Sequence, residues 1–396
     1  MITRAELNAV GEFQQLPATT IQKDYALGWI LRSVSAHPIL KEWLFKGGTC
    51  LKKCYFETYR FSEDLDFTIP VAHTVSVPYL ESHLETMVKW VEARCGLIFP
   101  RQDWKIEEYL NPRGKPAHMA KISYAGPHPQ PARSLQRIKF DLTQDEILVD
   151  EPDLRPLHHG YSDADYPPSL IRCYSIHEIL AEKTRALLQR KGRARDVYDL
   201  VNISRNFRDQ VDPERARRIA HAKFKFKDLP MPTVEGVLAA VDAGQLRAAW
   251  EDQLAHQIHQ LASVDSFLAD LPDALAWWLE PTKAQPKPPP IAGPDDRVAE
   301  RTTYAYFPSR NGPASMERIK QAAHRRLAAY VEYHDSTRLV EPYSLRYPST
   351  GNEILHVWEI EKSGRPVGAH RSYNVNDIQS ATVSNIEFRP RYAIEL

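Results

Sequence analysis

Apolar residues recur with two different periods along the first 150 residues, and each period predicts a different element. Steps of three and four residues are clearest over residues 21–31 and 80–91. The first stripe predicts a helix that braces the core from outside, and the second predicts an amphipathic helix that covers a sheet. The alternation over residues 120–124 and 136–142 predicts two strands, with a proline-rich turn between them.

The pattern changes twice after residue 175. Residues 176–280 are mostly helical in pattern, whereas the proline-rich residues 281–296 cannot continue a helix and favour an extended spacer. Beyond this spacer a helix is expected over residues 314–331, followed by strands at residues 353–360, 369–375 and 381–386. We therefore predict an α+β protein with a core of residues 1–175, a helical region, a linker and a C-terminal domain of residues 297–396.

Length and charge narrow the possible functions only a little. At 396 residues the chain is longer than one typical domain, so two or three compact units are expected. Lys plus Arg and Asp plus Glu both number 51, so any basic surface must be local. No segment approaches the roughly 18 apolar residues of a spanning helix, and the N-terminus has no charged start followed by an apolar run. We expect a cytoplasmic protein with no membrane partner.

The cysteines and histidines show no pattern of a metal site. The chain has four cysteines, namely Cys50, Cys54, Cys95 and Cys173. They are too few and too scattered for a disulfide framework, and no zinc-type spacing is present. Cys50 and Cys54 lie one turn apart on a predicted helix, which indicates packing, and His158 and His159 show no ligand spacing.

Two short motifs indicate binding of phosphate and metal. Gly47 and Gly48 let backbone N–H groups approach a polyphosphate, and Thr49 can cap the next helix or donate its hydroxyl to a phosphate. Asp64 and Asp66 occupy alternate positions of a strand, so both point to one side, where they can hold a divalent metal ion.

These motifs, separated by a spacer helix, resemble the core of the polymerase-beta-type nucleotidyltransferases. The segment from Arg60 to Phe67 is similar to the corresponding segment of the AbiEii/AbiGii toxin branch, and Lys23-Asp24-Tyr25 matches a recurrent element of that family. The resemblance implies a mixed sheet flanked by helices, an NTP as substrate and Mg²⁺ or Mn²⁺ as cofactor.

Two-metal nucleotidyl transfer needs a third carboxylate. Asp141 lies in an alternating strand on the face opposite Phe140 and Leu142, so the predicted metal ligands are Asp64, Asp66 and Asp141. Ser62 is expected to face the same side as these carboxylates and to contact the nucleotide. The alternative for Ser62 is a hydroxyl that hydrogen-bonds the backbone at the end of a strand.

Residues 174–200 resemble the last block of the family, a lysine-bearing helix followed by an Arg-Asp-x-x-Asp helix. The resemblance implies that Lys183 contacts the triphosphate and that Asp196 serves catalysis. Lys183 and Arg190 are seven residues apart and share a helix face, which would bind a polyphosphate. Asp196 and Asp199 share another face. The alternative is a solvated amphipathic helix with internal Arg–Asp pairs.

The densest basic cluster has phenylalanines between its cations and consists of Arg215, Arg217, Arg218, Lys223, Lys225 and Lys227. An RNA acceptor would contact such a patch through its phosphates, with a ring available for stacking. The alternative is an exposed helix face followed by a strand in which Phe224 and Phe226 are buried.

The last hundred residues resemble a WYL domain, a small Sm-like β-barrel of bacterial regulators and defence proteins. The similarity rests on Glu341-Pro342-Tyr343, on Trp358 and on the closing segment from Phe388 to Tyr392, although the Trp-Tyr-Leu tripeptide itself is absent. The resemblance implies that a pocket for a nucleotide or nucleic acid is lined by Tyr343, Arg346 and Arg371. The alternative is a barrel whose arginines are surface charges.

The expected function is a metal-dependent nucleotidyltransferase toxin. The resemblance implies transfer of NMP from an NTP to RNA, typically to the 3′ end of tRNA, in a type IV toxin–antitoxin or phage-defence system with a cognate antitoxin. Two alternatives remain: an enzyme that nucleotidylates protein, and a catalytically silent regulator that senses a nucleotide.

Overall fold

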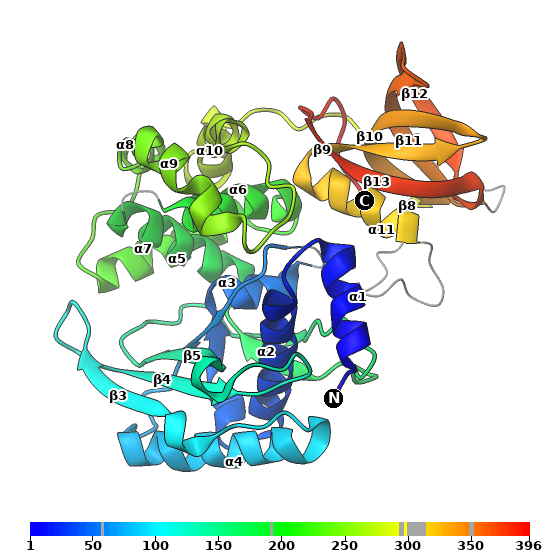
Figure 1. Ribbon diagram of the computed structural model, residues 1–396. Helices are drawn as coiled ribbons and strands as arrows, with labels where there is room; N and C mark the ends of the chain where they lie inside the picture. Colours follow the sequence, from blue (N-terminus) through cyan, green and yellow to red (C-terminus); the bar gives the residue numbers. More distant parts are fainter. Residues whose placement is uncertain (57–58, 191–192, 293–296, 299–313, 348–351) are drawn as a thin grey trace. The chain divides into compact units, whose positions relative to one another are not determined.

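The computed structural model describes residues 1–56, 59–190, 193–292, 297–298, 314–347 and 352–396 (Figure 1). These residues form two compact units. The first unit comprises Met1–His259 and Ala274–Pro281, and the second comprises Gln260–Asp273 and Thr282–Leu396. None of the helices in the described part of the chain combines the length and the apolar character needed to cross a bilayer.

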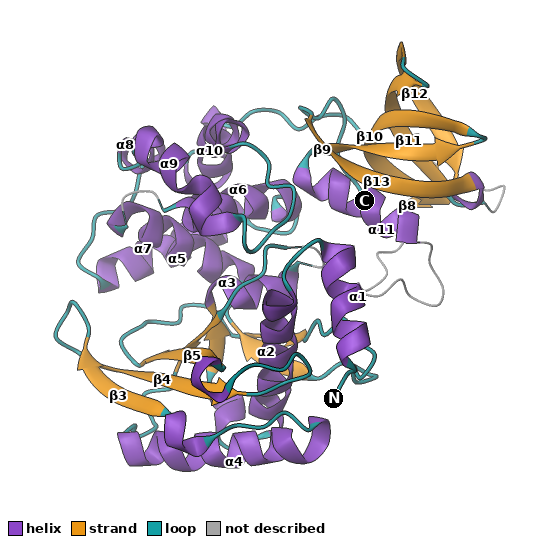
Figure 2. Cartoon of the chain, viewed as in Figure 1, coloured by secondary structure: helices purple, strands orange, loops and turns teal. Residues whose placement is uncertain are grey.

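The first unit is built on a seven-stranded mixed sheet with the order β3-β4-β5-β2-β1-β7-β6. Figure 2 shows its strands β3, β4 and β5. Its strands are β1 Leu44–Lys46, β2 Asp64–Thr68, β3 Lys105–Leu110, β4 Pro116–Tyr124, β5 Gln136–Thr143, β6 Asp153–Pro156 and β7 Leu170–Cys173. Strand β2 pairs antiparallel with β1 and parallel with β5, while β1 pairs parallel with β7. Both strands that were expected from alternation are confirmed, as β4 and β5.

The long helices from the first hundred residues of this unit are α1 Arg4–Gln14, α2 Ala18–Ala36 and α4 Val77–Cys95. The two predicted helical stripes are confirmed as α2 and α4. In α4 the apolar stripe is buried, and the helix begins where Ser76 accepts a hydrogen bond from the Tyr79 amide. It ends at Gly96, whose φ of 76° is in the left-handed region that glycine favours.

The helical region predicted after residue 175 is confirmed in the described residues. Its helices are α5 Ile176–Gln189, α6 Ala194–Phe207, α7 Pro213–Phe226, α8 Val234–Ala239, α9 Ala243–Leu254 and α10 Val264–Leu279. Side-chain caps start several of them, including Ser175 for α5 and Asp212 for α7. The strand expected around Phe224 and Phe226 is wrong, because α7 continues through Phe226.

The second unit contains an antiparallel sheet with the order β12-β11-β10-β9-β13, and β8 pairs with β10. Its elements are β8 Arg297–Val298, α11 Ala314–Arg325, β9 Leu327–Tyr333, β10 Ser336–Tyr347, β11 Ile354–Lys362, β12 Arg365–Asn374 and β13 Ile378–Glu387. The expected helix of residues 314–331 is too long. It ends at Arg325 because Arg326 adopts a left-handed φ of 60°, and β9 begins at Leu327.

The pairings of the described residues do not close this sheet into the expected barrel. A barrel requires its first and last strands to pair, but β12 and β13 stand at opposite ends of the strand order. Most side chains of β12 are exposed, so this strand is a sheet edge rather than part of a closed wall. The chain segment just before the second unit's first strand is partly packed, since Ile291 lies against Tyr343 and Phe388. Residues 293–296 of the expected linker lie outside the described residues.

Candidate active site

Strand β1 leads directly into the short helix α3, Gly47–Cys50, which continues as a π-helical turn, Leu51–Tyr55. The Gly-Gly-Thr turn is the start of α3. Gly47 has a φ of 80°, which L side chains rarely adopt. A Cβ at this position would lie only 2.1 Å from Asp66 Oδ2. Glycine therefore allows the backbone of the turn to pass beside the Asp66 carboxylate.

Sheet register brings the three predicted metal ligands to one face of the sheet. Asp66 in β2 is paired with Asp141 in β5 on one side and with Lys46 in β1 on the other. Asp64 lies two residues before Asp66 and therefore shares its face. The carboxylates thus come from two neighbouring strands, β2 and β5. Along the chain, β2 comes after the Gly-Gly-Thr turn and β5 comes after the proline-rich turn.

The surroundings of Asp64 and Asp66 favour the protonated form of these two carboxyl groups. Burial raises the pKa of Asp66 to about 6, and the negative charges of Asp141 and Asp64 add to this rise, while Lys46 and Lys183 oppose it. Burial also raises the pKa of Asp64, again with a contribution from Asp141. Neighbouring carboxylates that raise one another's pKa are typical of a site that a cation completes.

A lysine that sequence reasoning missed partly neutralises this face. Lys139 Nζ lies 2.6 Å from Asp141 Oδ2, and Lys139 is the register partner of Asp64. Burial lowers the pKa of Lys139, but the hydrogen bond and charge of Asp141 outweigh burial, so the pKa is raised. Among the described residues, the oxygen atoms of Asp64, Asp66 and Asp141 do not all lie within 4.8 Å of one another.

Thr49 and Ser62 tie the turn to β2. Thr49 is buried, and its Oγ1 lies 2.9 Å from Ser62 Oγ and donates to the Asp64 carbonyl oxygen. Thr49 does not cap α3, because Lys46 occupies the N-cap position of that helix. Ser62 Oγ faces the turn, since a Cβ on Gly48 would lie 3.2 Å from it.

The Lys-Asp-Tyr element of α2 contacts the residue before β2 and the π-helical turn that follows α3. Lys23 Nζ lies 3.0 Å from Glu63 Oε2, next to Asp64. Asp24 and Lys53 form a fully buried pair with an N–O distance of 2.8 Å. Burial would raise the pKa of Asp24, but the charges of Lys53 and Lys52 and the hydrogen bonds from Lys53 and Tyr161 together outweigh burial and lower the pKa. The expectation that this helix braces the core agrees with these contacts.

Helices α5 and α6 bring the second predicted group together. Lys183 Nζ lies 3.6 Å from Asp196 Oδ1 and 2.5 Å from Asp199 Oδ2. Asp196 is buried, and its Oδ2 has no hydrogen-bond partner in the described residues. A buried carboxylate oxygen without a partner is costly, which makes Asp196 a candidate functional group. Arg190 is more exposed, with Nη1 3.9 Å from that oxygen.

Asp199 is the centre of a network that sequence reasoning did not predict. Arg60 grips its carboxylate with two bonds, Nε to Oδ1 at 2.8 Å and Nη2 to Oδ2 at 2.9 Å. The Tyr59 hydroxyl also donates to Asp199. Burial would raise the pKa of Asp199, but Arg60 and Lys183 hold it well below its usual range. This ionised carboxylate fixes Lys183 and connects it to the segment that leads into β2.

Lys46, which precedes Gly47, is a further cation that sequence reasoning missed. Its Nζ lies 3.8 Å from Glu182 and 4.0 Å from Glu146, and 5.4 Å from the ring centre of Tyr174. Burial would raise the pKa of Glu182, but Lys46, Lys223 and Arg185 lower it to about 2. The sequence signal was only its position immediately before the glycine pair.

The basic cluster is divided between the surface and the interior. Lys223 is 1% exposed and lies 2.6 Å from Glu178 and 3.2 Å from Glu182, so it is not on an exposed patch. Lys227 is also largely buried and pairs with Asp145. In α7 the buried stripe includes Ala216, Ile219 and Ala220 and continues to Lys223. The helical spacing of Lys223 from these apolar residues was the sequence signal that its side chain is buried. The cluster residues that remain at least partly exposed are Arg215, Arg217, Arg218 and Lys225.

The described contacts do not join the three expected pocket residues of the second unit. Tyr343 is fully buried and donates its hydroxyl hydrogen to Glu341. Arg346 is buried and pairs with Glu395, whereas Arg371 is exposed and donates to the His370 carbonyl. Tyr343 and Arg346 thus hold the unit together in these contacts.

A comparison with protein families matches residues 29–280 to the family described as nucleotidyl transferase AbiEii toxin, type IV TA system. The match covers more than half of the chain and includes the Gly-Gly-Thr turn, the three aspartates and helices α5 and α6. No curated protein matches the chain.

Proposed function

Because the chain belongs to the AbiEii nucleotidyltransferase toxin family of type IV toxin–antitoxin systems, we propose that it transfers NMP from an NTP to RNA, at the 3′ end of tRNA. Membership makes the chain an enzyme of the nucleotidyltransferase type, with an NTP as substrate and an antitoxin as partner. The RNA acceptor and the metal requirement are the steps that we add.

The observation that carries the proposal is the register that sets Asp66 between Asp141 and Lys46, beside the backbone of Gly47. Carboxylate oxygens are the ligands that hard divalent cations prefer, so Mg²⁺ or Mn²⁺ would be held by Asp64, Asp66 and Asp141. The raised pKa of Asp66 fits such an ion, because a positive charge would relieve the repulsion. When bound, the ion neutralises charge that develops on the phosphates.

The protein's own groups would then orient the nucleotide. The backbone N–H groups at Gly47 and Gly48 are proposed to approach the triphosphate, with Lys183 as the cation on the α5 side. Ser62, which faces this turn, is proposed to donate to a phosphate oxygen, and Arg190 to approach it from solvent. Asp196 Oδ2 is proposed to accept a hydrogen bond from a hydroxyl of the nucleotide or the acceptor.

For the acceptor, we propose that the exposed cations of α7, Arg218 and Lys225 foremost, contact RNA phosphates.

We propose that the second unit is a WYL-like sensor or docking module, supported by its antiparallel strand order and by the packing of α11 on β9 and β13. We also retain the predicted division into residues 1–175, 176–280 and 281–296 as a proposal.

A second candidate, nucleotidylation of a protein hydroxyl, is favoured by one observation. Lys223 and Lys227 are held in internal ion pairs, so the basic surface is smaller than expected for an RNA-binding face. The same phosphoryl transfer would serve a protein acceptor.

The test is incubation of the purified chain with Mg²⁺, one α-labelled NTP at a time, and either total tRNA or cell lysate. Label on tRNA with the parent chain, and none with Asp64→Ala, is the expected result. Label on protein alone would replace the RNA acceptor by a protein. Absence of transfer with all four NTPs and both acceptor mixtures would contradict the proposal.

A further inference from the structure

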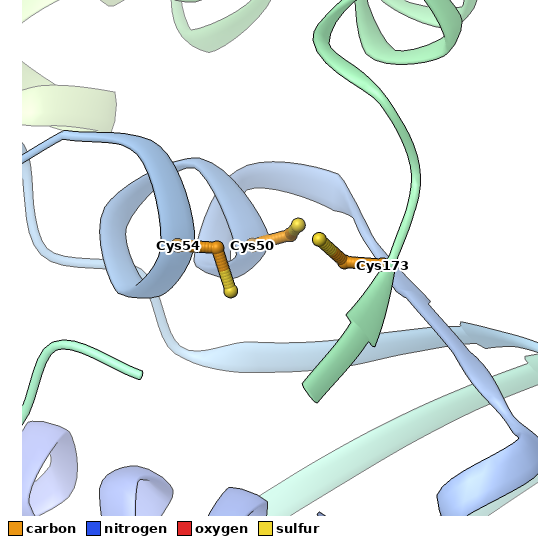
Figure 3. A group of neighbouring side chains, drawn as sticks. All are labelled: Cys50, Cys54 and Cys173. Carbon is orange, nitrogen blue, oxygen red and sulfur yellow. The ribbon is translucent and has the colours of Figure 1, made fainter. Parts of the chain in front are cut away.

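Three buried cysteines from two segments of the chain meet next to the Gly-Gly-Thr turn (Figure 3). Cys50 is the last residue of α3, Cys54 lies in the π-helical turn that follows, and Cys173 ends β7. Their sulfur atoms all lie within 4.8 Å of one another, and each cysteine is free. In Figure 3 the sulfur atoms of Cys50 and Cys173 point toward each other.

The fold explains why residues more than 100 positions apart converge. Cys50 and Cys54 are four residues apart and share one face of the helical segment. Strand β1 leads into this segment, and its Phe45 is the parallel register partner of Cys173. The sheet therefore places Cys173 beside the start of the helical segment, a contact that the spacing of cysteines along the chain does not reveal.

We propose that Cys50, Cys54 and Cys173 bind one thiophilic metal ion, with Zn²⁺ as the expected ion. Soft thiolates select such ions, whereas the aspartates of the candidate active site suit hard cations. A Zn–S bond of about 2.3 Å requires the three sulfur atoms to lie about 4 Å apart. The observed separations, all within 4.8 Å, need only small adjustments of the side chains.

Charge and the fourth ligand position can both be satisfied locally. Each thiol releases its proton to solvent as its sulfur bonds the ion, and no electron is transferred. The resulting negative charge lies near Arg155, whose Nε donates to the Cys54 carbonyl oxygen at 2.7 Å. The hydroxyl oxygen of Tyr55 lies 3.9 Å from Cys173 Sγ and is the group that could approach the fourth position.

Such an ion would link the Gly-Gly-Thr turn of the candidate active site to the neighbouring strand β7. Cys50 directly follows the Gly-Gly-Thr turn, and Cys173 precedes Tyr174, whose amide donates to the Phe45 carbonyl oxygen. A bound ion would therefore hold the turn against β7. This role does not depend on the proposed transfer reaction, because the metal site is built from other side chains.

The test begins with the purified parent chain and Zn²⁺ alone, measured by metal analysis and native mass spectrometry. We expect one tightly bound ion per chain, lost in Cys50→Ala and Cys173→Ala. It should be retained in Cys95→Ala, since Cys95 is also buried but lies outside the trio. Retention in Asp66→Asn would distinguish this ion from one held by the aspartates.

A second measurement does not depend on folding of the variants. With Co²⁺ in place of Zn²⁺, the parent chain should show sulfur-to-cobalt charge-transfer absorption, and bound Zn²⁺ should slow alkylation of the trio but not of Cys95. An unchanged metal content in folded Cys50→Ala and Cys173→Ala variants would overturn the proposal. So would a folded parent chain that binds no ion, or one in which a Cys50–Cys173 disulfide forms instead.

Discussion

Two groups of carboxylates in the first unit, one half-buried and one buried, have opposite electrostatic surroundings. At the centre of the sheet, burial and the charges of Asp141 and Asp64 raise the pKa of Asp66 to about 6. Between α6 and the segment before β2, the effect of burial on Asp199 is outweighed by Arg60 and Lys183, which hold its pKa well below the usual range. The cations near the first group do not balance its negative charge, whereas the cations near the second group more than balance the cost of its burial.

This difference separates a group that is open to a ligand from a group that holds the fold. A carboxylate without enough positive charge gains free energy when a cation arrives, so it marks a binding site. The Asp199 carboxylate already has two hydrogen bonds from Arg60 and an ion pair with Lys183, so it gains little from a further cation. Removing it should lower stability before it affects ligand binding. Each of the predictions below tests one side of this contrast.

The largest effect is expected at the centre of the sheet. Asp66→Asn should lower nucleotide transfer by about a thousandfold, because the loss of a proposed metal ligand removes several kcal/mol of transition-state stabilisation. The same change removes one of the repelling charges, so the melting temperature should stay level or rise. Transfer rates and thermal unfolding of the purified variant measure both. Near-normal transfer, or an unfolded variant, would contradict the division into a ligand group and a structural group.

Breaking the second group should cost stability. Arg60→Leu leaves Asp199 buried without its main partner, and we expect unfolding to become easier by about 3–5 kcal/mol. Urea unfolding of parent and variant gives this free energy. The double variant Arg60→Leu with Asp199→Leu should recover part of the loss, because no buried charge is then left alone. An Arg60→Leu variant as stable as the parent would show that the network is not structural.

The two groups should also respond oppositely to pH. Asp66 has a raised pKa in the folded chain, so the stability that its proton gives is present below pH 4 and is lost as pH rises toward 6. The loss is up to about 3 kcal/mol. Asp199 has a lowered pKa, so its contribution is present above the unfolded pKa and falls as the solution becomes more acidic.

Unfolding experiments between pH 4 and 7 isolate the contribution of Asp66, because the contribution of Asp199 changes only at lower pH. The free energy of unfolding of the parent chain should fall relative to that of Asp66→Asn as pH rises from 4 to 6. Millimolar Mg²⁺ at pH 7 should reduce this difference between parent and variant. A difference that does not change with pH would mean that Asp66 is ionised at no cost, and the contrast with Asp199 would disappear.

Local patterns predicted more of this molecule than long-range pairing did. The stripes of α2 and α4, the alternation of β4 and β5, and the helices after residue 175 all arise from residues close in sequence. The family motifs then pointed to β2, β5, α5 and α6, which carry the residues of the candidate site. The barrel expected for the second unit rested on resemblance alone, and the described strand pairings leave that sheet open.

The missed residues share one physical cause. Lys139 and Lys46 face the aspartates only because the sheet register pairs them with Asp64 and Asp66. Arg60 meets Asp199 across 139 positions of chain, and Cys173 meets Cys50 through the parallel pairing of β1 with β7. Register and crossover connections are not encoded in the period of a single segment, so one sequence does not reveal these contacts.

The smallest predicted effect concerns the surface of α7. Arg218→Ala and Lys225→Ala should each raise the KM for tRNA a few-fold and reduce the salt dependence of binding by about one charge, leaving kcat unchanged. Lys89→Ala on α4 is the matched control, because Lys89 is equally exposed but lies on another helix. Steady-state transfer at several salt concentrations measures both parameters. If the α7 variants behave as Lys89→Ala does, the acceptor does not use this face, and the contrast between buried and exposed cations of the cluster has no bearing on RNA.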